Sequence, residues 1–400
     1  MRAALLALPL LAGCVTAPTP IAGAPVAEAG VAFDASGERG AYAVGLADPA
    51  AARAITPDDP VRIASISKLV VAIGVMKLVE QGRLDLHSDL SQWLGWHLRN
   101  PAFPDRPISL RQLLSHTSSI RDFDDQYVIP LGGSVRAIMA DPRSWDSARG
   151  PGDGYFTYSN MNFPIVGSLV ETVTGERFDR WMHREVLAPM KLDACFNWSG
   201  CSDAAIARAV VLTRDGEVVR DDLKGRPPEC LVFVRDGQAC DLSTYRLGDN
   251  GALFAPQGGL RISARGLARV GRLLLGRGTL DGVRLVSEQS VDAILAPVWR
   301  FDGSNGVTDR GFYCAYGLAA QLLANPATGC ADDPGADRVE WAGHAGDAYG
   351  LRSGLWVDRA RGVGIAYFVT GMTADPPFGR SAYRAVEEGA FQRTRALLDR

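Results

Sequence analysis

The distribution of apolar residues predicts strands near both ends of the chain and helices between them. Short β-like runs broken by Gly and Asp indicate an antiparallel hairpin at 30–46, and two later segments, 317–323 and 354–369, have the composition of strands. A closing helix is expected at 383–398. Because the strands lie at the two ends, the pattern favours an α/β domain whose sheet is built from both termini.

The segment 68–81 is apolar on every side of a helical repeat, which is typical of a helix buried in the core, and Gly82 is its predicted end. Short helices and loops fill residues 83–190, so a second, mostly helical lobe is expected over roughly 83–290. Within this lobe, residues 195–259 contain four cysteines and mixed β-like runs, and we interpret them as a cysteine-rich insertion.

The N-terminus has the pattern of an export signal. A short basic start and an apolar run end in Leu11-Ala12-Gly13-Cys14, which resembles a bacterial lipoprotein signal over residues 1–14. We expect lipidation of Cys14, a flexible tether at 15–29, and a single domain at 30–400. An ordinary secretory signal with a chance cysteine is the alternative. The expected location is the periplasm, with a lipid anchor in the outer membrane.

Six further cysteines fall into three local pairs. In an exported protein an even number of cysteines predicts disulfides, and we expect each pair to close a small loop, although six cysteines permit other connectivities. The pairs are Cys195–Cys201, Cys230–Cys240 and Cys314–Cys330. The cysteines lack the paired spacing of zinc knuckles and the five histidines are scattered, so no metal site and no cofactor are expected.

The charge balance excludes one class of partner. The formal net charge is -3, and there is no basic run, so the sequence offers no electrostatic basis for nucleic-acid binding. A hydrophobic content of 47% with 22% charged residues is typical of an ordered globular protein.

Lysine is rare in this chain. Only four of the 42 basic residues are lysines: Lys68, Lys77, Lys191 and Lys224. Because arginine stays charged whereas a buried lysine can lose its proton, a retained lysine is a candidate for proton transfer. Lys68 follows Ser65 by three residues, which places both side chains on one helical face. Ser65 is therefore a candidate nucleophile with a base one turn away, although a Ser-x-x-Lys also arises by chance.

Two further elements carry candidate chemistry. Tyr158-Ser159-Asn160 combines a tyrosine, which beside a lysine can titrate below its usual pKa and move protons, with an amide that can hold substrate and Lys68. His344-Ala345-Gly346, followed by Asp347, has a glycine that lets a strand edge approach a ligand. An aromatic residue in a turn and a structural histidine are the alternatives. The other four histidines are expected to be structural or at the surface.

In this order, the three elements resemble those of the serine β-lactamase/penicillin-binding superfamily. The resemblance is to its class C-like branch, which also includes esterases, D-aminopeptidases and D-Ala-D-Ala carboxypeptidases. Further matching stretches are Arg62-Ile63-Ala64-Ser65, Leu113-Leu114-Ser115-His116-Thr117-Ser118 and Gly258-Gly259-Leu260. The resemblance covers roughly residues 30 to 395. It implies a β-lactamase-like fold, in which helices flank an antiparallel sheet built from both chain ends, beside a mostly helical lobe.

The resemblance also implies roles for individual residues. Ser65 would be the acylated nucleophile and Lys68 its proton partner, with Tyr158 as the general base for acylation and the acid for the leaving group. The backbone N–H groups of Ser65 and Asp347 would form the oxyanion hole, beside Gly346 in the substrate-binding strand.

Asn160 would align the substrate, and His344 would stand where the lactamases carry the lysine of their Lys-Thr-Gly strand. A neutral histidine binds a carboxylate less strongly than a lysine does, which favours an esterase or peptidase over a β-lactamase. We therefore expect a serine hydrolase that forms an acyl-enzyme with an ester or a peptide-like amide, taken from a small molecule or short peptide. The alternatives are a class C-like β-lactamase and a non-catalytic penicillin-binding or sensor protein.

Overall fold

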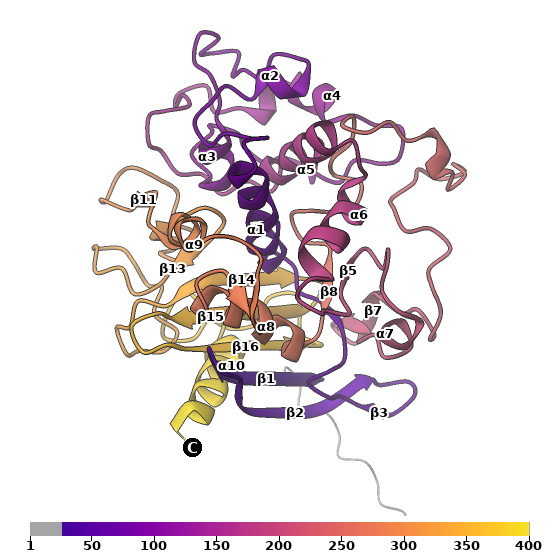
Figure 1. Cartoon of the computed structure of the whole chain (residues 1–400). Helices are drawn as coiled ribbons and strands as arrows, with labels where there is room; N and C mark the ends of the chain where they lie inside the picture. Colours follow the sequence, from indigo (N-terminus) through magenta and orange to yellow (C-terminus); the bar gives the residue numbers. More distant parts are fainter. Residues whose placement is uncertain (1–25, 400) are drawn as a thin grey trace, which may run out of the picture.

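The computed structural model describes residues 26–399, and its main element is a nine-stranded antiparallel sheet (Figure 1). Strands from the two ends of the chain meet in this sheet, where Ala27 pairs with Thr370. From edge to edge the strands are β11 (Trp299–Arg300), β12 (Ala315–Tyr316), β13 (Gln321–Leu322), β14 (Ala342–Ala348), β15 (Leu351–Asp358), β16 (Val363–Thr370), β1 (Ala27–Asp34), β2 (Glu38–Asp48) and β3 (Arg53–Ala54). The predicted fold class is confirmed.

Helices cover both faces of the sheet. Helix α10 (Ala385–Arg395) packs on one face, where it contacts Trp356 and Tyr367 through a shared apolar cluster. Helix α8 (Ala264–Leu275) packs on the other face against β1, β15 and β16. Successive residues of a strand point to opposite faces, which lets both faces be apolar. The predicted extent of the helical lobe, to about 290, is too long, because α8 belongs to the sheet domain.

Helix α1 (Ile66–Glu80) is buried on nearly all sides, as its sequence predicts. It ends at Gln81, and Gly82 follows in the left-handed conformation (φ +67°) that glycine adopts without strain. The helix contacts β14 and β15 of the sheet and also α9 (Glu288–Leu295). In Figure 1 it runs from the sheet towards the helical lobe, so its N-terminus lies where the two parts meet.

The helical lobe is organised around α5 (Asn162–Thr174), whose first ten residues are all buried. Four short helices contact it: α2 (Ser91–Leu94), α3 (Leu110–Leu114), α4 (Val135–Met139) and α6 (Phe178–Met182). Single turns of other helix types occur at Pro142–Ser144, His183–Leu187, Leu242–Thr244 and Ala396–Asp399.

The cysteine-rich insertion has little regular structure. A small sheet joins β5 (Cys195–Phe196) to β8 (Leu260–Ile262) and β4 (Val61–Arg62), the strand that leads into α1. The insertion also contains α7 (Asp203–Ala207) and a hairpin of β6 (Leu212–Arg214) with β7 (Glu217–Arg220). A further hairpin, β9 (Thr279–Leu280) with β10 (Val283–Arg284), follows α8 outside the insertion. All three predicted disulfides are present: Cys195–Cys201, Cys230–Cys240 and Cys314–Cys330.

Some predicted boundaries are wrong or lie beyond the described residues. The tether was expected to reach residue 29, but β1 begins at Ala27, because this segment completes a backbone ladder with β16. The strand expected at 317–323 is limited to β13, because residues 317–320 form the turn that joins it to β12. Cys14 and the signal segment lie outside the described residues. Within residues 26–399, no helix is both long and apolar enough to cross a bilayer.

Candidate active site

Lys68 contacts both its own motif and Asn160 of the second motif, 92 residues further along the chain. Its side chain is fully buried, and Nζ lies 3.0 Å from Ser65 Oγ and 2.8 Å from Asn160 Oδ1. Nζ also donates to the backbone carbonyl of Gln257 at 2.7 Å. These three partners match the three N–H donors of an ammonium group. The helical spacing thus puts Ser65 and Lys68 in direct contact, and folding adds Asn160.

The environment of Lys68 makes it able to lose its proton. Burial lowers the pKa of its ammonium group to about 7, and the negative charge of Asp122 opposes this fall. Near neutral pH a large share of Lys68 is therefore the free amine, whose lone pair can accept a proton from the Ser65 hydroxyl. Arginine could not replace it in this role, because its guanidinium stays protonated.

The backbone before Ser65 is held in an unusual conformation. Ala64 has φ +51°, a left-handed value that costs free energy for a residue with a Cβ and is often found at functional sites. Ser67 holds this turn, because its hydroxyl donates to the Ala64 carbonyl at 2.6 Å and accepts from the Leu260 N–H at 3.1 Å. The Ser65 side chain does not cap α1, so its hydroxyl remains available to Lys68.

Tyr158 is packed between two rings, His116 at 4.4 Å and Tyr313 at 4.7 Å between centroids. Burial raises the pKa of its phenol, although the nearby hydroxyls of Ser65 and Tyr313 oppose the rise. The expectation that Lys68 would lower this pKa is therefore wrong, because desolvation of the phenolate outweighs the attraction of the cation, 5.1 Å from the ring centroid. A neutral tyrosine suits the role of acid better than that of base.

Asp122 and His116 hold the Tyr158-Ser159-Asn160 loop in place. The Asp122 carboxylate accepts from the Ser159 hydroxyl at 2.7 Å, from the Asn160 N–H at 2.7 Å and from the Met161 N–H at 3.1 Å. The Ser159 N–H donates to His116 Nδ1 at 3.1 Å. Sequence reasoning missed Asp122, which lies outside every motif, and placed His116 among the structural or surface histidines. His116 is structural, because it accepts from the Ser159 N–H, and it lies in the site.

His344 lies behind the site rather than in its cavity. Its ring is 1% exposed, and Nε2 is 2.7 Å from the Tyr316 hydroxyl while Nδ1 is 2.5 Å from the Ala345 carbonyl. Burial lowers the pKa of the imidazole to about 3, so the ring is neutral. The structure brings His344 within 6.2 Å of Tyr158, centroid to centroid, but its two nitrogens already have partners in the protein. Direct contact with substrate stays a prediction.

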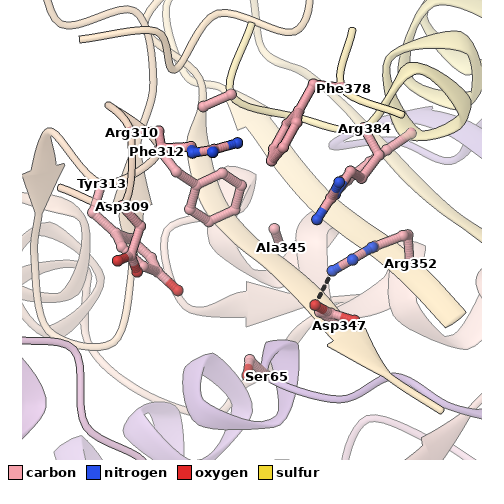
Figure 2. A pocket seen from close by; sticks show the side chains of 13 residues that line it. Ser65, Asp309, Arg310, Phe312, Tyr313, Ala345, Asp347, Arg352, Phe378 and Arg384 are labelled. Carbon is pink, nitrogen blue, oxygen red and sulfur yellow. Dashed lines mark ion pairs between the residues drawn. The ribbon is translucent and has the colours of Figure 1, made fainter. Parts of the chain in front are cut away.

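Gly346 lets β14 pass directly beside the residues that precede Ser65. A Cβ at this position would lie 2.3 Å from the Ile63 carbonyl oxygen and 2.3 Å from Ser353 Oγ. Glycine is thus required by packing. Asp347 follows at the rim, where its carboxylate forms an ion pair with Arg352 and Ser65 lies nearby (Figure 2).

Ser65, Gly346 and Asp347 border a cavity of about 390 Å³. Aromatic side chains line part of it, including Phe378 and Tyr313, and Figure 2 shows arginine side chains directed into it from several elements. The Arg384 guanidinium lies 3.8 Å above the Phe378 ring and is 2.7 Å from Asp375. The arginines of the cavity are Arg310, Arg352 and Arg384. No sequence motif pointed to them.

Charged groups of both signs line the cavity. Asp347 lines the wall and forms an ion pair with Arg352, which also lines it. Burial raises the pKa of Glu387 to about 8, so this carboxyl group is largely neutral near pH 7, whereas Arg384 is paired with Asp375. Arg352 Nε is buried and has no hydrogen-bond partner among residues 26–399.

Over the described part of the chain, no group of three or more His, Cys, Asp and Glu residues could hold a metal ion. The site itself brings together the Ser65 hydroxyl, the Lys68 amine and the neutral phenol of Tyr158.

The chain belongs to the Beta-lactamase family, whose model matches residues 23–390. Esterase EstB of Burkholderia gladioli is 25% identical over 351 residues, which are 81% of this chain and 80% of that protein. The D-amino acid amidase of Ochrobactrum anthropi SV3 has a TM-score of 0.65 and 20% identity, with 94% of each chain covered. The octameric penicillin-binding protein homologue of Pyrococcus abyssi has a TM-score of 0.66 and 18% identity, covering 93% of this chain and 74% of that one. The family expected from the motifs is confirmed, and the two solved structures share its fold.

Proposed function

We propose that this protein is a serine hydrolase that cleaves an ester or amide through an acyl-enzyme on Ser65. The observation that carries the proposal is the contact of Lys68 Nζ with Ser65 Oγ at 3.0 Å, made by a lysine whose pKa is about 7. Similarity to an esterase over most of the chain supports the same class of reaction.

The first half of the reaction follows from this geometry. Neutral Lys68 takes the Ser65 proton as Oγ attacks the carbonyl carbon of the substrate. The backbone N–H groups of Ser65 and Asp347 would then hold the oxyanion. Tyr158, kept neutral by burial, donates a proton to the leaving oxygen or nitrogen, and the Lys68 ammonium beside its ring stabilises the phenolate that results. Water releases the acyl group by the reverse sequence of proton transfers.

The cavity arginines indicate a substrate with a carboxylate near the scissile bond. Arg352 and Arg384 approach Ser65 from β15 and from the start of α10, and Figure 2 shows both directed toward the space above it. They supply the positive charge that the neutral, enclosed His344 cannot. This charge also favours a second candidate, acylation by penicillins, whose carboxylate a guanidinium can bind.

The proposal is tested with a fluorophosphonate probe, p-nitrophenyl esters, D-amino acid amides and benzylpenicillin, followed by intact mass after timed incubation. We expect the probe to label Ser65 and at least one ester or amide to be turned over. A lasting penicillin adduct on Ser65 would favour a penicillin-recognising protein, and hydrolysed penicillin without an adduct would favour a lactamase. Absence of label on Ser65 in folded protein would contradict the acyl-enzyme.

Arg384→Gln is expected to raise KM about tenfold for substrates with a carboxylate next to the scissile bond, because one charge-assisted contact is lost. KM for an uncharged ester of the same acyl group should stay unchanged. Arg300→Gln is the matched control, since Arg300 forms an ion pair with Glu340 outside the cavity. Equal changes for charged and uncharged substrates would contradict a carboxylate contact.

Asp122→Asn is expected to lower kcat/KM by about 10- to 100-fold, because Asp122 positions the loop of Tyr158 and Asn160. Its negative charge also raises the pKa of Lys68, so its removal should move the acidic limb of the pH profile to lower pH. The exposed Asp124→Asn is the control. An acidic limb that stays in place would show that Lys68 is not the group that titrates.

We further propose export to the periplasm. Three disulfides are typical of exported proteins, which supports export in general. The finer location rests on the lipoprotein-like signal, with Cys14 as the residue that would be lipidated.

A further inference from the structure

A second cavity of about 390 Å³ lies beside the cysteine-rich insertion. It shares no lining residue with the cavity of Ser65. Its wall combines the small sheet of β4 and β8 with insertion residues and with Tyr349, which follows β14. Gln257 is in this wall, and its backbone carbonyl is the one that accepts from Lys68. The second cavity is thus a neighbour of the catalytic centre, separated from it by Gln257.

Two buried arginines face each other in this wall. Arg62 and Arg261 are direct cross-strand partners in β4 and β8, and they are 7% and 1% exposed. Like charges directly opposite each other destabilise a strand pair, and burial strengthens the repulsion. A third arginine, Arg220, adds to the charge: the Arg62 and Arg220 guanidinium carbons lie 5.0 and 5.3 Å from the centroid of the Tyr349 ring.

One buried carboxylate, Asp221, stands against these three cations, and one of its two oxygens is already engaged, whereas Oδ2 has no hydrogen-bond partner among the described residues. Asp221 Oδ1 accepts from Arg261 Nη2 at 2.9 Å and from Trp198 Nε1 at 3.2 Å. Arg261 is held further by Asn197 Oδ1, at 2.8 Å from Nη1. Arg261 and Asp221 therefore form a pair, and Arg62 is left over.

Arg62 has the strongest unmet demand for a partner. Its Nε and Nη1 are buried and make no hydrogen bond to any described residue. Burial lowers the pKa of its guanidinium to about 9, with the charge of Arg261 as the second cause. An unpaired buried charge strongly destabilises a fold, whereas an anion in the cavity would satisfy both the charge and the free N–H groups. The planar fork of a guanidinium fits a carboxylate bidentately.

Apart from Tyr127 and the exposed carboxylate Asp222, the rest of the wall is apolar, which defines the remainder of the ligand. Val128 and Ile129 of the helical lobe face insertion residues such as Leu231, Val232 and Phe233 across the same space. We propose that this cavity binds an organic carboxylate, whose anionic group pairs with Arg62 and whose hydrocarbon part lies against the insertion. The inference does not depend on the hydrolase mechanism, because no residue of the Ser65 cavity takes part.

The experiment uses the full chain with Ser65→Ala, which removes acylation, and hexanoate as the probe, with 1-hexanol and inorganic phosphate beside it. Calorimetry and thermal unfolding are expected to show binding of hexanoate and a rise in Tm, with little effect of hexanol. Adding Arg62→Met should weaken hexanoate at least tenfold and should not lower the Tm of the ligand-free protein, because an unpaired charge is removed. The exposed Arg214→Met is the matched control and should bind as the parent does.

Four results would overturn the proposal. The first is a hexanoate effect that survives Arg62→Met, and the second is hexanol binding as well as hexanoate. The third is no binding of hexanoate by the Ser65→Ala parent, a measurement that does not require the Arg62 variant to fold. Binding of phosphate without hexanoate would likewise overturn the organic carboxylate in favour of a small inorganic anion. Because Ser65 is absent throughout, none of these outcomes depends on acylation.

Discussion

Replacing Ser65 with alanine is expected to lower kcat by about 10⁴-fold or more on any ester or amide that the protein turns over, because the nucleophile is lost and only binding and oxyanion contacts remain. Labelling by a fluorophosphonate probe should disappear at the same time. Thermal unfolding should change little, since the Ser65 hydroxyl caps no helix and its recorded partner is Lys68. Initial rates with a chromogenic ester, together with intact mass, measure both effects.

Ser304→Ala is the matched control, because Ser304 is exposed in a turn and bonds only to Asp302. A folded Ser65→Ala protein that keeps a tenth or more of the activity would place the nucleophile elsewhere. It would then be necessary to ask whether Lys68 serves a different hydroxyl.

Replacing Lys68 with arginine is expected to lower kcat/KM by about 10²- to 10⁴-fold, the usual contribution of a general base. Arginine keeps the positive charge but cannot give up its proton, so the change separates a base from a fixed cation. In the parent protein, kcat/KM should rise with pH through about 7, because the pKa of Lys68 is about 7 and only the deprotonated amine can accept the Ser65 proton. This acidic limb should be absent from whatever activity remains in Lys68→Arg.

Lys77→Arg provides the control in the same helix. Lys77 forms an ion pair with Glu185 near the end of α1, where arginine can do the same. If Lys68→Arg kept both its rate and its acidic limb, Lys68 would act only as a cation, and Tyr158 would have to be the base despite its raised pKa. Tyr158→Phe would then remove the limb.

Local chemistry made several features readable from the chain alone. The spacing of Ser65 and Lys68 by three residues brings their side chains together in any helix, and the apolar composition of 68–81 makes that helix a core helix. The three disulfides close short loops, so their partners are also near in sequence. The hairpin at the start of the chain follows from short β-like runs broken by Gly and Asp.

Features that depend on long-range packing were not readable. Asp122 holds the loop of Asn160 from a separate segment, and Arg384 reaches the cavity of Ser65 from the residue that precedes α10. Neither belongs to a local pattern. The imidazole of His344 was expected at the substrate, yet it bonds to Tyr316, which only the pairing of short strands brings beside it.

The direction of a pKa shift also required the tertiary structure. The sequence placed Lys68 and Tyr158 in one site, and proximity to the lysine suggested a lowered pKa for the tyrosine. Burial penalises the charged form of each group, so it lowers the pKa of Lys68 and raises that of Tyr158. The sequence by itself thus determined that Ser65 and Lys68 lie together, since their spacing along one helix is local. Only the folded structure decided which of them can accept a proton, since desolvation depends on residues from the whole chain.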